Sequence, residues 1–470
     1  MESSLLGAKQ LLLCCLFLFL WALAAVAEAK TVHEQWDISY QFTHSDCVRK
    51  LAVTINGGTP GPTIRAVQGD TVVAKTVHEQ WDISYQFTHS DCVRKLAVTI
   101  NGGTPGPTIR AVQGDTVVVT VKNLLMTENV AIHWHGIRQL GTPWADGTEG
   151  VTQCPILPGD TFEYRYNCSA MASDAAAACN ATHPECAPQV FAVVPGRTYR
   201  FRIASVTSLS ALNFEIEADK RDRGRPRPTR TPPAGPAWND SAYRINQSLA
   251  TVAHPEHAHP PPPRADRTIL LLNSQNKIDG RIKWAINNVS FTLPHTPYLV
   301  ALKHGLLGAF DQRPPPETYN HTGYDVYGVQ ANPNATTSDG LYRLAFGSVV
   351  DVVLQNANML APNNSETHPW HLHGHDFWTL GYGVGRFDPA VHPATYNLRD
   401  PVMKNTVAVH PFGWTALRFR ADNPGVWAFH CHIEAHFFMG MGVAFEEGIE
   451  RVGDLPEEIR RCVSTKGGGH

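Results

Sequence analysis

Residues 427–441 read Trp-Ala-Phe-His-Cys-His-Ile-Glu-Ala-His-Phe-Phe-Met-Gly-Met, and they govern the interpretation of the whole chain. In an extended strand, side chains two residues apart share one face, and the side chain between them points to the other. His430 and His432 can therefore serve one metal centre while Cys431 serves another behind it. This pattern predicts a strand that joins two metal centres through a few covalent bonds, which is a short path for electrons.

The donor types in this stretch indicate copper. A Cys thiolate, two imidazoles and a long, weak thioether ligand are typical of a blue-copper electron-transfer site. Cys431, His436 and Met441 supply three of these four ligands, and a second imidazole must come from elsewhere. Zinc is the weaker interpretation, because structural zinc sites favour several thiolates or a Cys-x₂₋₄-Cys spacing, which this sequence lacks.

Two further histidine clusters can complete these centres. Residues 368–375 read His-Pro-Trp-His-Leu-His-Gly-His, which offers His368 to the blue site and leaves His371 and His373 for other coppers. Residues 133–136 read His-Trp-His-Gly and add two imidazoles at strand spacing. One such pair alone would usually be structural. Three clusters, one of them with a cysteine between its histidines, favour metal binding.

The rest of the chain predicts an all-β protein. Apolar and polar residues alternate with a period of two over residues 162–166, 199–203 and 212–217, which is typical of half-buried strands. Turn signals such as Leu-Pro-Gly-Asp at 157–160 separate these strands, and no long helical period occurs. We expect a β-sandwich or Greek-key barrel, with one short helix near residues 456–462.

Composition excludes some partners and favours a secreted protein. The 470 residues include 39 Lys and Arg against 42 Asp and Glu, so the formal charge of −3 predicts neither nucleic-acid nor anionic-membrane binding. Residues 1–29 combine Lys9, an apolar run and small residues, which indicates a secretory signal peptide; an anchoring helix is the alternative. Eight Asn-x-Ser/Thr sequences predict glycosylation, at Asn167, Asn180, Asn239, Asn246, Asn288, Asn320, Asn334 and Asn363.

The chain contains a perfect tandem repeat. Residues 29–73 reappear letter for letter as residues 74–118. Only the second copy continues into Val119-Thr120-Val121 and the histidines beyond, so we expect it to form the native strands and the first copy to be surplus. Farther on, residues 220–266 are rich in Arg, His and Pro, which predicts a linker with little packed structure.

The histidine motifs, together with Asp-Gly-Thr at 146–148 and the stretch to Ile156, resemble the copper motifs of plant multicopper oxidases. Trp-Ala-Ile-Asn-Asn-Val at 284–289 and Met441 resemble the ascorbate oxidase branch more than the laccases. The resemblance implies three cupredoxin-like domains, a type 1 copper in the last and a trinuclear cluster between first and last. Here it implies a truncated first domain at 74–167, a remnant of the second at 168–219 and a complete third at 267–470.

The resemblance also assigns ligands and an activity. It implies that ascorbate, or a phenol as second choice, is oxidised one electron at a time while O₂ is reduced to water, by a protein secreted to the apoplast or cell wall. His436 would face the substrate, and Trp284 would line its pocket, although ordinary core packing explains Trp284 equally well. The implied ligands are His368, Cys431, His436 and Met441 for type 1, His133 and His371 for type 2, and His135, His373, His430 and His432 for type 3.

One motif of the family is missing. The type 3 pair should receive its last two imidazoles from a second His-x-His in the first domain, but His183 is the only histidine between Gly136 and Ala253. His257-Ala258-His259 has the spacing but lies in the Pro-rich segment, where a solvated role is expected. We therefore expect little four-electron O₂ reduction. The alternative functions are a non-catalytic secreted copper-binding glycoprotein that keeps only the type 1 site, and a laccase-like phenol oxidase.

The resemblance implies three disulfides as well. It pairs Cys154 with Cys462, Cys168 with Cys179 and Cys92 with Cys186. The duplicate Cys47 then has no partner, in agreement with a surplus first copy. Such a set of disulfides is consistent with a secreted protein.

Overall fold

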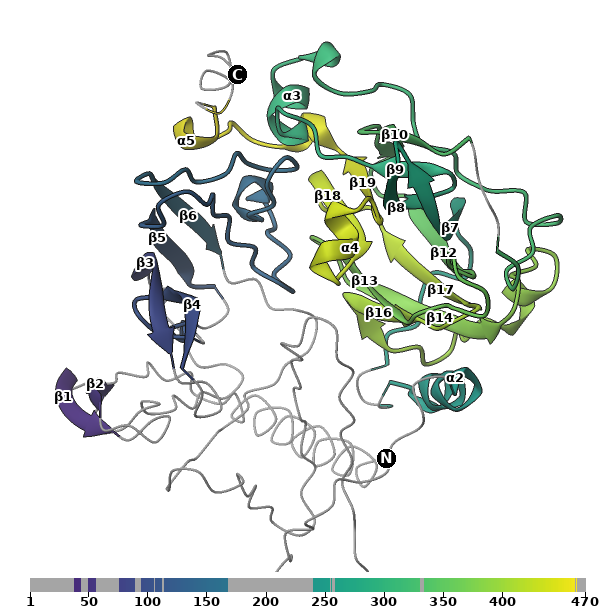
Figure 1. Ribbon diagram of the computed structural model, residues 1–470, viewed down its shortest axis with the longest axis horizontal. Coiled ribbons are helices and arrows are strands. Elements are labelled where there is room, and N and C mark those ends of the chain that lie inside the picture. Colours follow the sequence, from purple (N-terminus) through teal and green to yellow (C-terminus); the bar gives the residue numbers. More distant parts are fainter. Residues whose placement is uncertain are drawn as a thin grey trace, which may run out of the picture. The chain divides into compact units, whose positions relative to one another are not determined.

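The computed structural model describes residues 38–43, 50–55, 76–88, 94–104, 106–111, 114–167, 240–253, 255, 258–329, 334–460 and 462 (Figure 1). The chain divides into two compact units. One comprises residues 1–75, 87–96 and 176–198, and the other comprises residues 76–86, 97–175 and 199–470. The larger unit holds every candidate metal ligand.

A four-stranded sheet forms the first part of the larger unit, apart from residues 87–88 and 95–96, which are assigned to the smaller unit. Its order is β4 (Lys95–Ile100), β3 (Thr76–Thr88), β5 (Thr116–Asn123) and β6 (Thr161–Asn167). β3 runs parallel to β5, and β5 pairs antiparallel with β6. Val117, Val119 and Val121 alternate along β5 and are fully buried with Trp81 and Tyr164. This core supports the loop that carries the first histidine cluster.

The first copy of the repeat does not enter that sheet. Its strands β1 (Ile38–Thr43) and β2 (Lys50–Ile55) pair antiparallel in a two-stranded sheet of their own. They have the same sequences as the end of β3 and the whole of β4. The second copy supplies β3, which pairs with β5, and β4, which lies beside β3.

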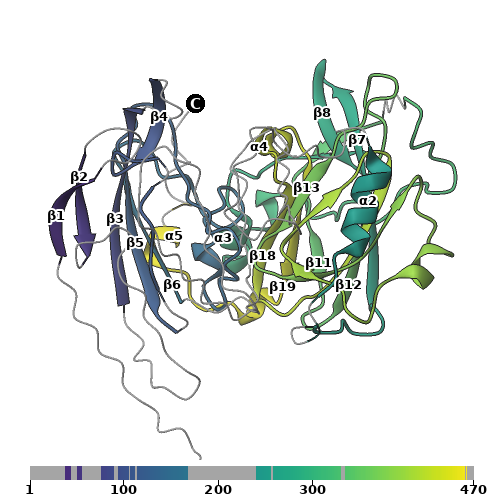
Figure 2. The same ribbon diagram turned by 90° about the horizontal axis from the view of Figure 1, so that it is seen from below.

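Two sheets form the C-terminal part as a sandwich (Figures 1 and 2). The eight-stranded sheet has the order β10 (Thr336–Ser338), β9 (Val289–Phe291), β8 (Arg281–Ile286), β7 (Arg267–Ile278), β12 (Val349–Asn356), β17 (Gly413–Arg420), β14 (Phe377–Val384) and β15 (Met403–Lys404). The five-stranded sheet has the order β11 (Tyr342–Leu344), β19 (Gly442–Glu447), β18 (Gly425–Cys431), β13 (His368–Leu372) and β16 (Thr406–Val409).

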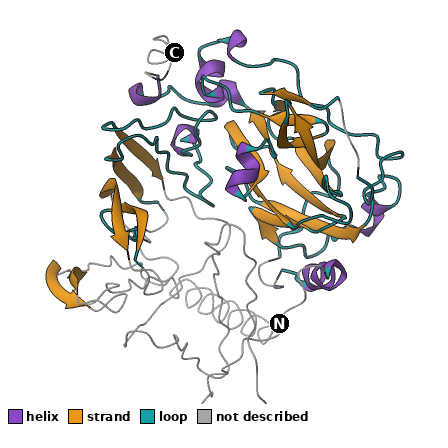
Figure 3. Cartoon of the chain, viewed as in Figure 1, coloured by secondary structure: helices purple, strands orange, loops and turns teal. Residues whose placement is uncertain are grey.

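The core of the sandwich lies between these two sheets. Leu271, Val352 and Leu417 come from the eight-stranded sheet and cluster with Trp370 and Phe429 of the five-stranded one. Strands dominate the described part of the chain (Figure 3), so the all-β prediction is confirmed. The strands predicted over residues 199–203 and 212–217 lie outside the described residues, as does the signal segment 1–29.

The described helices are short. They are α2 (Ser241–Ala250), α3 (Tyr298–Lys303), α4 (Glu434–Phe438) and α5 (Glu457–Arg460), with 3-10 turns η3 (Pro143–Ala145), η5 (Leu307–Ala309), η6 (His392–Thr395) and η7 (Ile449–Arg451). α5 is the helix predicted near residues 456–462. Among the residues that the structure describes, no helix has the length and apolar character needed to span a bilayer.

The prediction of little packed structure over residues 220–266 is wrong for its later part. The Asp240 side chain accepts a hydrogen bond from the Tyr243 backbone and caps α2, and Ile245 is buried in the sandwich core. Beyond the helix, the carbonyl of His259 accepts from Trp378 Nε1 at 2.7 Å, and that of Pro262 accepts from Arg418. The high proline content of this segment hid the sequence signal of one capped, amphipathic helix, α2. Residues 220–239 lie outside the described part.

The disulfide between Cys154 and Cys462 is confirmed. It joins the first part of the larger unit to the end of the chain, 308 residues later. The other two predicted pairs, and Cys47, involve residues outside the described ranges.

Candidate metal centre

Three donor atoms of the predicted blue site converge inside the sandwich. The Cys431 Sγ lies 3.7 Å from Nδ1 of His368 and 3.7 Å from Nδ1 of His436. Cys431 and His368 are fully buried, whereas the side chain of His436 is 12% exposed. Met441 is buried in the same core cluster, and its carbonyl accepts a hydrogen bond from the Cys431 backbone at 3.0 Å.

Strand pairing brings these residues together from distant parts of the sequence. β13 pairs antiparallel with β18, which sets Trp370 opposite Cys431 and His371 opposite His430. Cys431 points into the sandwich core, while His430 contacts other imidazoles on the other side. One strand therefore presents a thiol to one group of donors and an imidazole to another.

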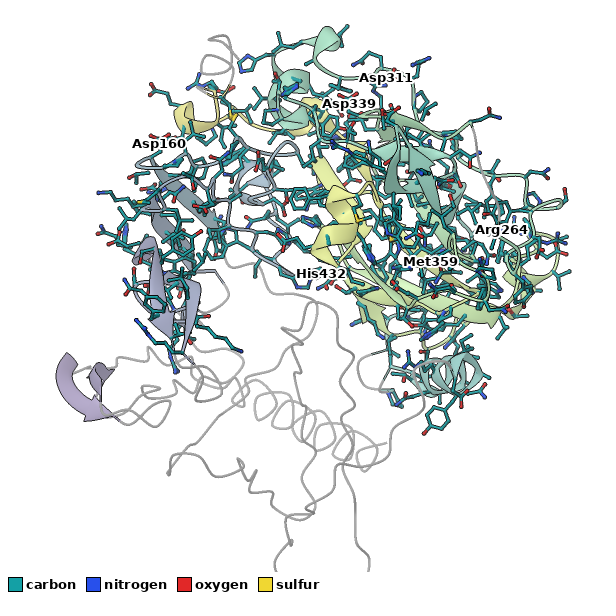
Figure 4. The ribbon with its side chains drawn as sticks, in the orientation of Figure 1. Asp160, Arg264, Asp311, Asp339, Met359 and His432 are labelled. Carbon is teal, nitrogen blue, oxygen red and sulfur yellow. A yellow bond between two sulfur atoms is a disulfide. The ribbon has the colours of Figure 1, made fainter. Side chains whose placement is uncertain are left out.

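Six histidines form the second group. They come from the loop after β5, from β13 and the turn that follows it, and from β18 and its end: His133, His135, His371, His373, His430 and His432. Nε2 of His133 lies 3.4 Å from Nε2 of His371, and Nε2 of His373 lies 2.9 Å from Nε2 of His430. We call this group the imidazole cluster. His432 is labelled beside α4 in Figure 4.

The rings of the imidazole cluster pack on one another. His133 stacks on His373 with ring centroids 3.9 Å apart, and His135 stacks on His371 at 4.0 Å. His135 also meets His432 edge to face at 4.7 Å. His135 and His432 are both exposed, unlike His371 and His373, which are buried.

Acceptor oxygens orient these rings from behind. Nδ1 of His373 donates to Asp146 Oδ2 at 2.9 Å, and Nδ1 of His371 donates to the Asn405 carbonyl at 2.8 Å. Nδ1 of His430 donates to the Cys431 carbonyl at 2.9 Å. A hydrogen bond at Nδ1 fixes the tautomer and leaves the Nε2 lone pair free to bind a metal.

Asp146 has the largest part in this arrangement. Its carbonyl accepts from His133 Nδ1 at 2.8 Å while its carboxylate accepts from His373. Burial alone would raise the pKa of this carboxyl, but its electrostatic interactions and hydrogen bonds with His373 and His133 hold the pKa well below its ordinary value. Asp146 belongs to the Asp-Gly-Thr motif at 146–148, but the motif did not indicate this role. The Asn405 carbonyl gave no sequence signal, because main-chain acceptors are common to all residues.

Burial favours the neutral form of His368, His371 and His373 and the protonated form of the Cys431 thiol in the metal-free protein. Burial lowers the pKa of His368 to about 3 and that of His373 to about 4. It places the pKa of His371 well below the ordinary value, and it raises the pKa of Cys431 to about 12. Neutral imidazoles are ready ligands, whereas the thiol must lose its proton to solvent when it binds a cation.

Both groups fit copper by their donor chemistry. The ligand atoms of His368, Cys431 and His436 all lie within 4.8 Å of one another, and so do those of His133, His371 and His373. Buried thiolate, imidazole and thioether donors suit copper, and the imidazole cluster offers only nitrogen donors.

No further imidazole of a second His-x-His joins the cluster among the residues that the structure describes. His183 and His257 lie outside the described ranges, and His259 is exposed. The candidate substrate residue Trp284 is 1% exposed, with its ring centroid 4.8 Å from that of His368 and 5.2 Å from that of His436. It forms a wall of the blue site and offers no open ring face, which favours the core-packing interpretation.

Comparison with known proteins finds one family throughout the chain. Three models, each described as multicopper oxidase, match residues 82–174, 164–219 and 310–451. An L-ascorbate oxidase of Cucumis sativus is 38% identical, with 97% of this chain and 95% of the relative covered. Laccase-2 of Oryza sativa subsp. japonica is 29% identical, with 98% and 100% covered.

Solved structures agree on the fold. The laccase from Botrytis aclada matches with a TM-score of 0.57 at 19% identity, covering 84% of this chain and 92% of that one. Fet3p, described as a multicopper oxidase that functions in iron import, matches with a TM-score of 0.55 at 18% identity, covering 83% and 94%.

The alignment with the cucumber relative also shows that this chain lacks part of that protein's sequence. It extends over 610 positions, whereas this chain has 470 residues, so at least 140 positions of the relative have no counterpart here. The second family model matches only residues 164–219. Where in the chain the missing positions fall stays a prediction.

Proposed function

Because the chain belongs to the multicopper oxidase family, we propose that it is a secreted copper oxidoreductase that accepts electrons one at a time from a small planar reductant. Ascorbate is the first choice of reductant and a phenol the second. The higher identity to L-ascorbate oxidase than to laccase supports this order. The observation that carries the proposal is Cys431, which reaches one donor group while His430 beside it reaches the other.

His368, Cys431, His436 and Met441 would hold the first copper, and the imidazole cluster would hold the others. Copper in these places supplies the one-electron redox chemistry of the family. The protein contributes a dry, apolar surrounding for the thiolate and one partly exposed imidazole edge at His436. A reductant at that edge would be one side chain away from the thiolate.

Residues 430–432 connect the two donor groups through the backbone. The hydrogen bond from His430 Nδ1 to the Cys431 carbonyl orients the ring whose Nε2 faces His373. The same three residues thus supply ligands to both groups and the covalent link between them. This linkage supports electron transfer from the blue site to the imidazole cluster.

We further propose that four-electron reduction of O₂ is weak in this chain. The first domain lacks the second His-x-His that the family resemblance implies, so the imidazole cluster has six of the eight expected imidazoles. The exposure of His135 and His432 supports the same conclusion, because those two rings lack cover on one side. An incomplete set of ligands lowers the affinity for the metal and leaves its coordination geometry less fixed.

Copper analysis and O₂ uptake of the full chain, purified alone, test these proposals. We expect strong blue absorbance, more than about one copper per chain, loss of that absorbance as ascorbate reduces the bound copper, and little O₂ consumption. Ascorbate-dependent O₂ uptake with water as the product, at the ratio of four electrons per O₂, would contradict the proposed weak reduction. Absence of blue absorbance would contradict the type 1 site.

A copper-binding glycoprotein without catalysis is the second candidate. It is favoured by the contrast between the buried donors of the blue site and the exposed His135 and His432. This candidate predicts about one copper per chain, held by the blue site alone, and no catalytic turnover of ascorbate or phenols. Comparison of ascorbate with phenols under the same conditions separates an ascorbate oxidase from a laccase-like phenol oxidase.

A further inference from the structure

A buried pair of polar side chains lies behind the imidazole cluster. Nε2 of His375, in the turn after β13, is 2.8 Å from Oε1 of Glu447, the last residue of β19. The two side chains are 2% and 0% exposed. Neither residue belongs to a donor group, and an ionisable pair is rarely buried so completely without a structural or functional reason.

The pair holds the main chain of a metal ligand. Nδ1 of His375 donates to the carbonyl oxygen of His373 at 3.0 Å. The turn between them requires Gly374, whose φ is +69° and whose missing Cβ would lie 2.4 Å from the Trp427 ring. Trp427 therefore fixes the path of the turn, and His375 fixes the direction of the carbonyl.

Glu447 also links the pair to the loop that carries His133 and His135. Its Oε1 also accepts from the Asn423 backbone at 2.9 Å. The Asn423 side-chain amide then donates to the carbonyls of Gly374 at 2.9 Å and Arg138 at 2.6 Å. Arg138 follows His135 by three residues and donates in turn to the Gly374 carbonyl. One carboxylate is thus linked to two of the three segments that supply the imidazole cluster.

We propose that the buried His375–Glu447 pair is a positioning device for the imidazole cluster, which sets the backbone of His373 so that its Nε2 meets that of His430. Asp146 orients the His373 ring from its Nδ1 side, and the pair orients the same residue from its carbonyl. The inference rests on the proposed binding of copper by His373. Outer partners of metal ligands of this kind typically contribute 10- to 100-fold to metal affinity.

The test is a Cu²⁺ titration of the metal-stripped full chain against a competing chelator. Blue absorbance reports the Cys431 site, and the total bound copper minus that fraction reports the imidazole cluster. We expect E447L to lower the Cu²⁺ affinity of the imidazole cluster by about 10- to 100-fold, while blue absorbance per chain is kept. E447Q should bind as the unmodified chain does, because its amide oxygen accepts the same hydrogen bonds.

Glu446 provides the matched control. It is the neighbouring residue on β19, is 7% exposed, and faces Arg343 instead of the cluster. E446L should leave the copper affinity of the imidazole cluster unchanged. If E447L does not fold, the double variant H375F/E447L removes both polar partners and leaves no unpaired buried charge. It should show the same weakened imidazole cluster beside an intact blue site.

Unchanged affinity of the imidazole cluster in E447L or in the double variant would overturn the inference, as would an equal loss in E446L. Loss of blue absorbance in parallel with the loss of cluster affinity would also overturn it, because the effect would then be a general loss of structure. If the unmodified chain binds copper at the blue site alone, the proposed function and the inference both fail. That result is visible before any substitution is made.

Discussion

At the scale of single residues, the site depends on which side of a strand each side chain occupies. Cys431 is fully buried in the sandwich core, and His430 beside it contacts His373. The thiolate belongs to one donor group only, so its loss should spare the other. The chemistry of the two groups can therefore be separated with one substitution.

Cys431→Ser tests this separation. A hydroxyl is a harder and weaker copper ligand than a thiolate, so we expect the strong blue absorbance to disappear. Copper in the imidazole cluster should remain, because no ligand of that group is changed. Absorbance and copper analysis of the purified chain measure both effects. Blue absorbance that persists in the variant would contradict the assignment of Cys431.

A pH dependence follows from the buried histidines of the metal-free protein. Burial lowers the pKa of His410 to about 4, and the same cause lowers those of His373 and His368 to about 4 and 3. The unfolded chain binds these protons near pH 6.5, so it holds more protons than the folded chain between about pH 6.5 and 4. Stability is therefore complete above this range and is lost as the pH falls through it.

The melting temperature of the metal-stripped protein measures this loss between pH 7 and pH 5. His133 acts in the opposite direction, because Asp146 raises its pKa. More of the buried histidines have a lowered pKa than a raised one, so the loss of stability at low pH prevails. His410→Gln offers a check outside the ligand set, since His410 is 6% exposed and bonds Ser248 at 3.2 Å. The variant should show a shallower fall in melting temperature. A profile that is flat in both proteins would refute the effect.

Ligand spacing could be recognised in the sequence, whereas the partners of the ligands could not. His-x-His and His-Cys-His mark their residues because strand alternation is local and regular. Asp146 acts across 227 residues on His373, and His375 gains its partner Glu447 across 72 residues. Residues so far apart in the sequence come together only when the sheets pack, so no local sequence pattern predicts these contacts.

At the scale of elements, the sequence predicted strands better than the one packed helix of the Pro-rich segment. The strand character of β18 follows from the alternation of His430, Cys431 and His432. α2 instead depends on a cap at Asp240 and on one anchor, Ile245, which is 4% exposed in the core. A single buried side chain in a polar helix gives a weak periodic signal, and the nearby prolines favour an extended interpretation.

Ile245→Ala tests whether α2 is part of the folded core. Truncation of a buried isoleucine typically lowers the free energy of unfolding by about 2–5 kcal/mol. Tyr243→Ala is the control on the same helix, because Tyr243 is 53% exposed and surface changes usually stay within about 0.5 kcal/mol. Urea unfolding of both variants measures the difference. Equal stabilities would mean that α2 does not contribute to the core.

At the scale of the whole molecule, the exact repeat poses the remaining question. β1 and β2 pair with each other, while the strands of the second copy join β5 in the four-stranded sheet. A two-stranded sheet alone is marginally stable in water. Sequence predicted this division because only the second copy continues into the first histidine cluster. Local patterns could not show how the first copy would pair.

Deletion of one copy should therefore leave the metal-binding unit unchanged. The two copies are identical, so removal of residues 29–73 or of residues 74–118 yields the same shortened chain. We expect the same copper content, blue absorbance and urea midpoint as in the unmodified protein, because β3–β6 and the sandwich are retained. The denatured, unreduced chain should lose one reactive thiol, since Cys47 is the cysteine predicted to lack a partner. A fall in copper content or in the urea midpoint would show that β1 and β2 of the first copy stabilise the metal-binding unit.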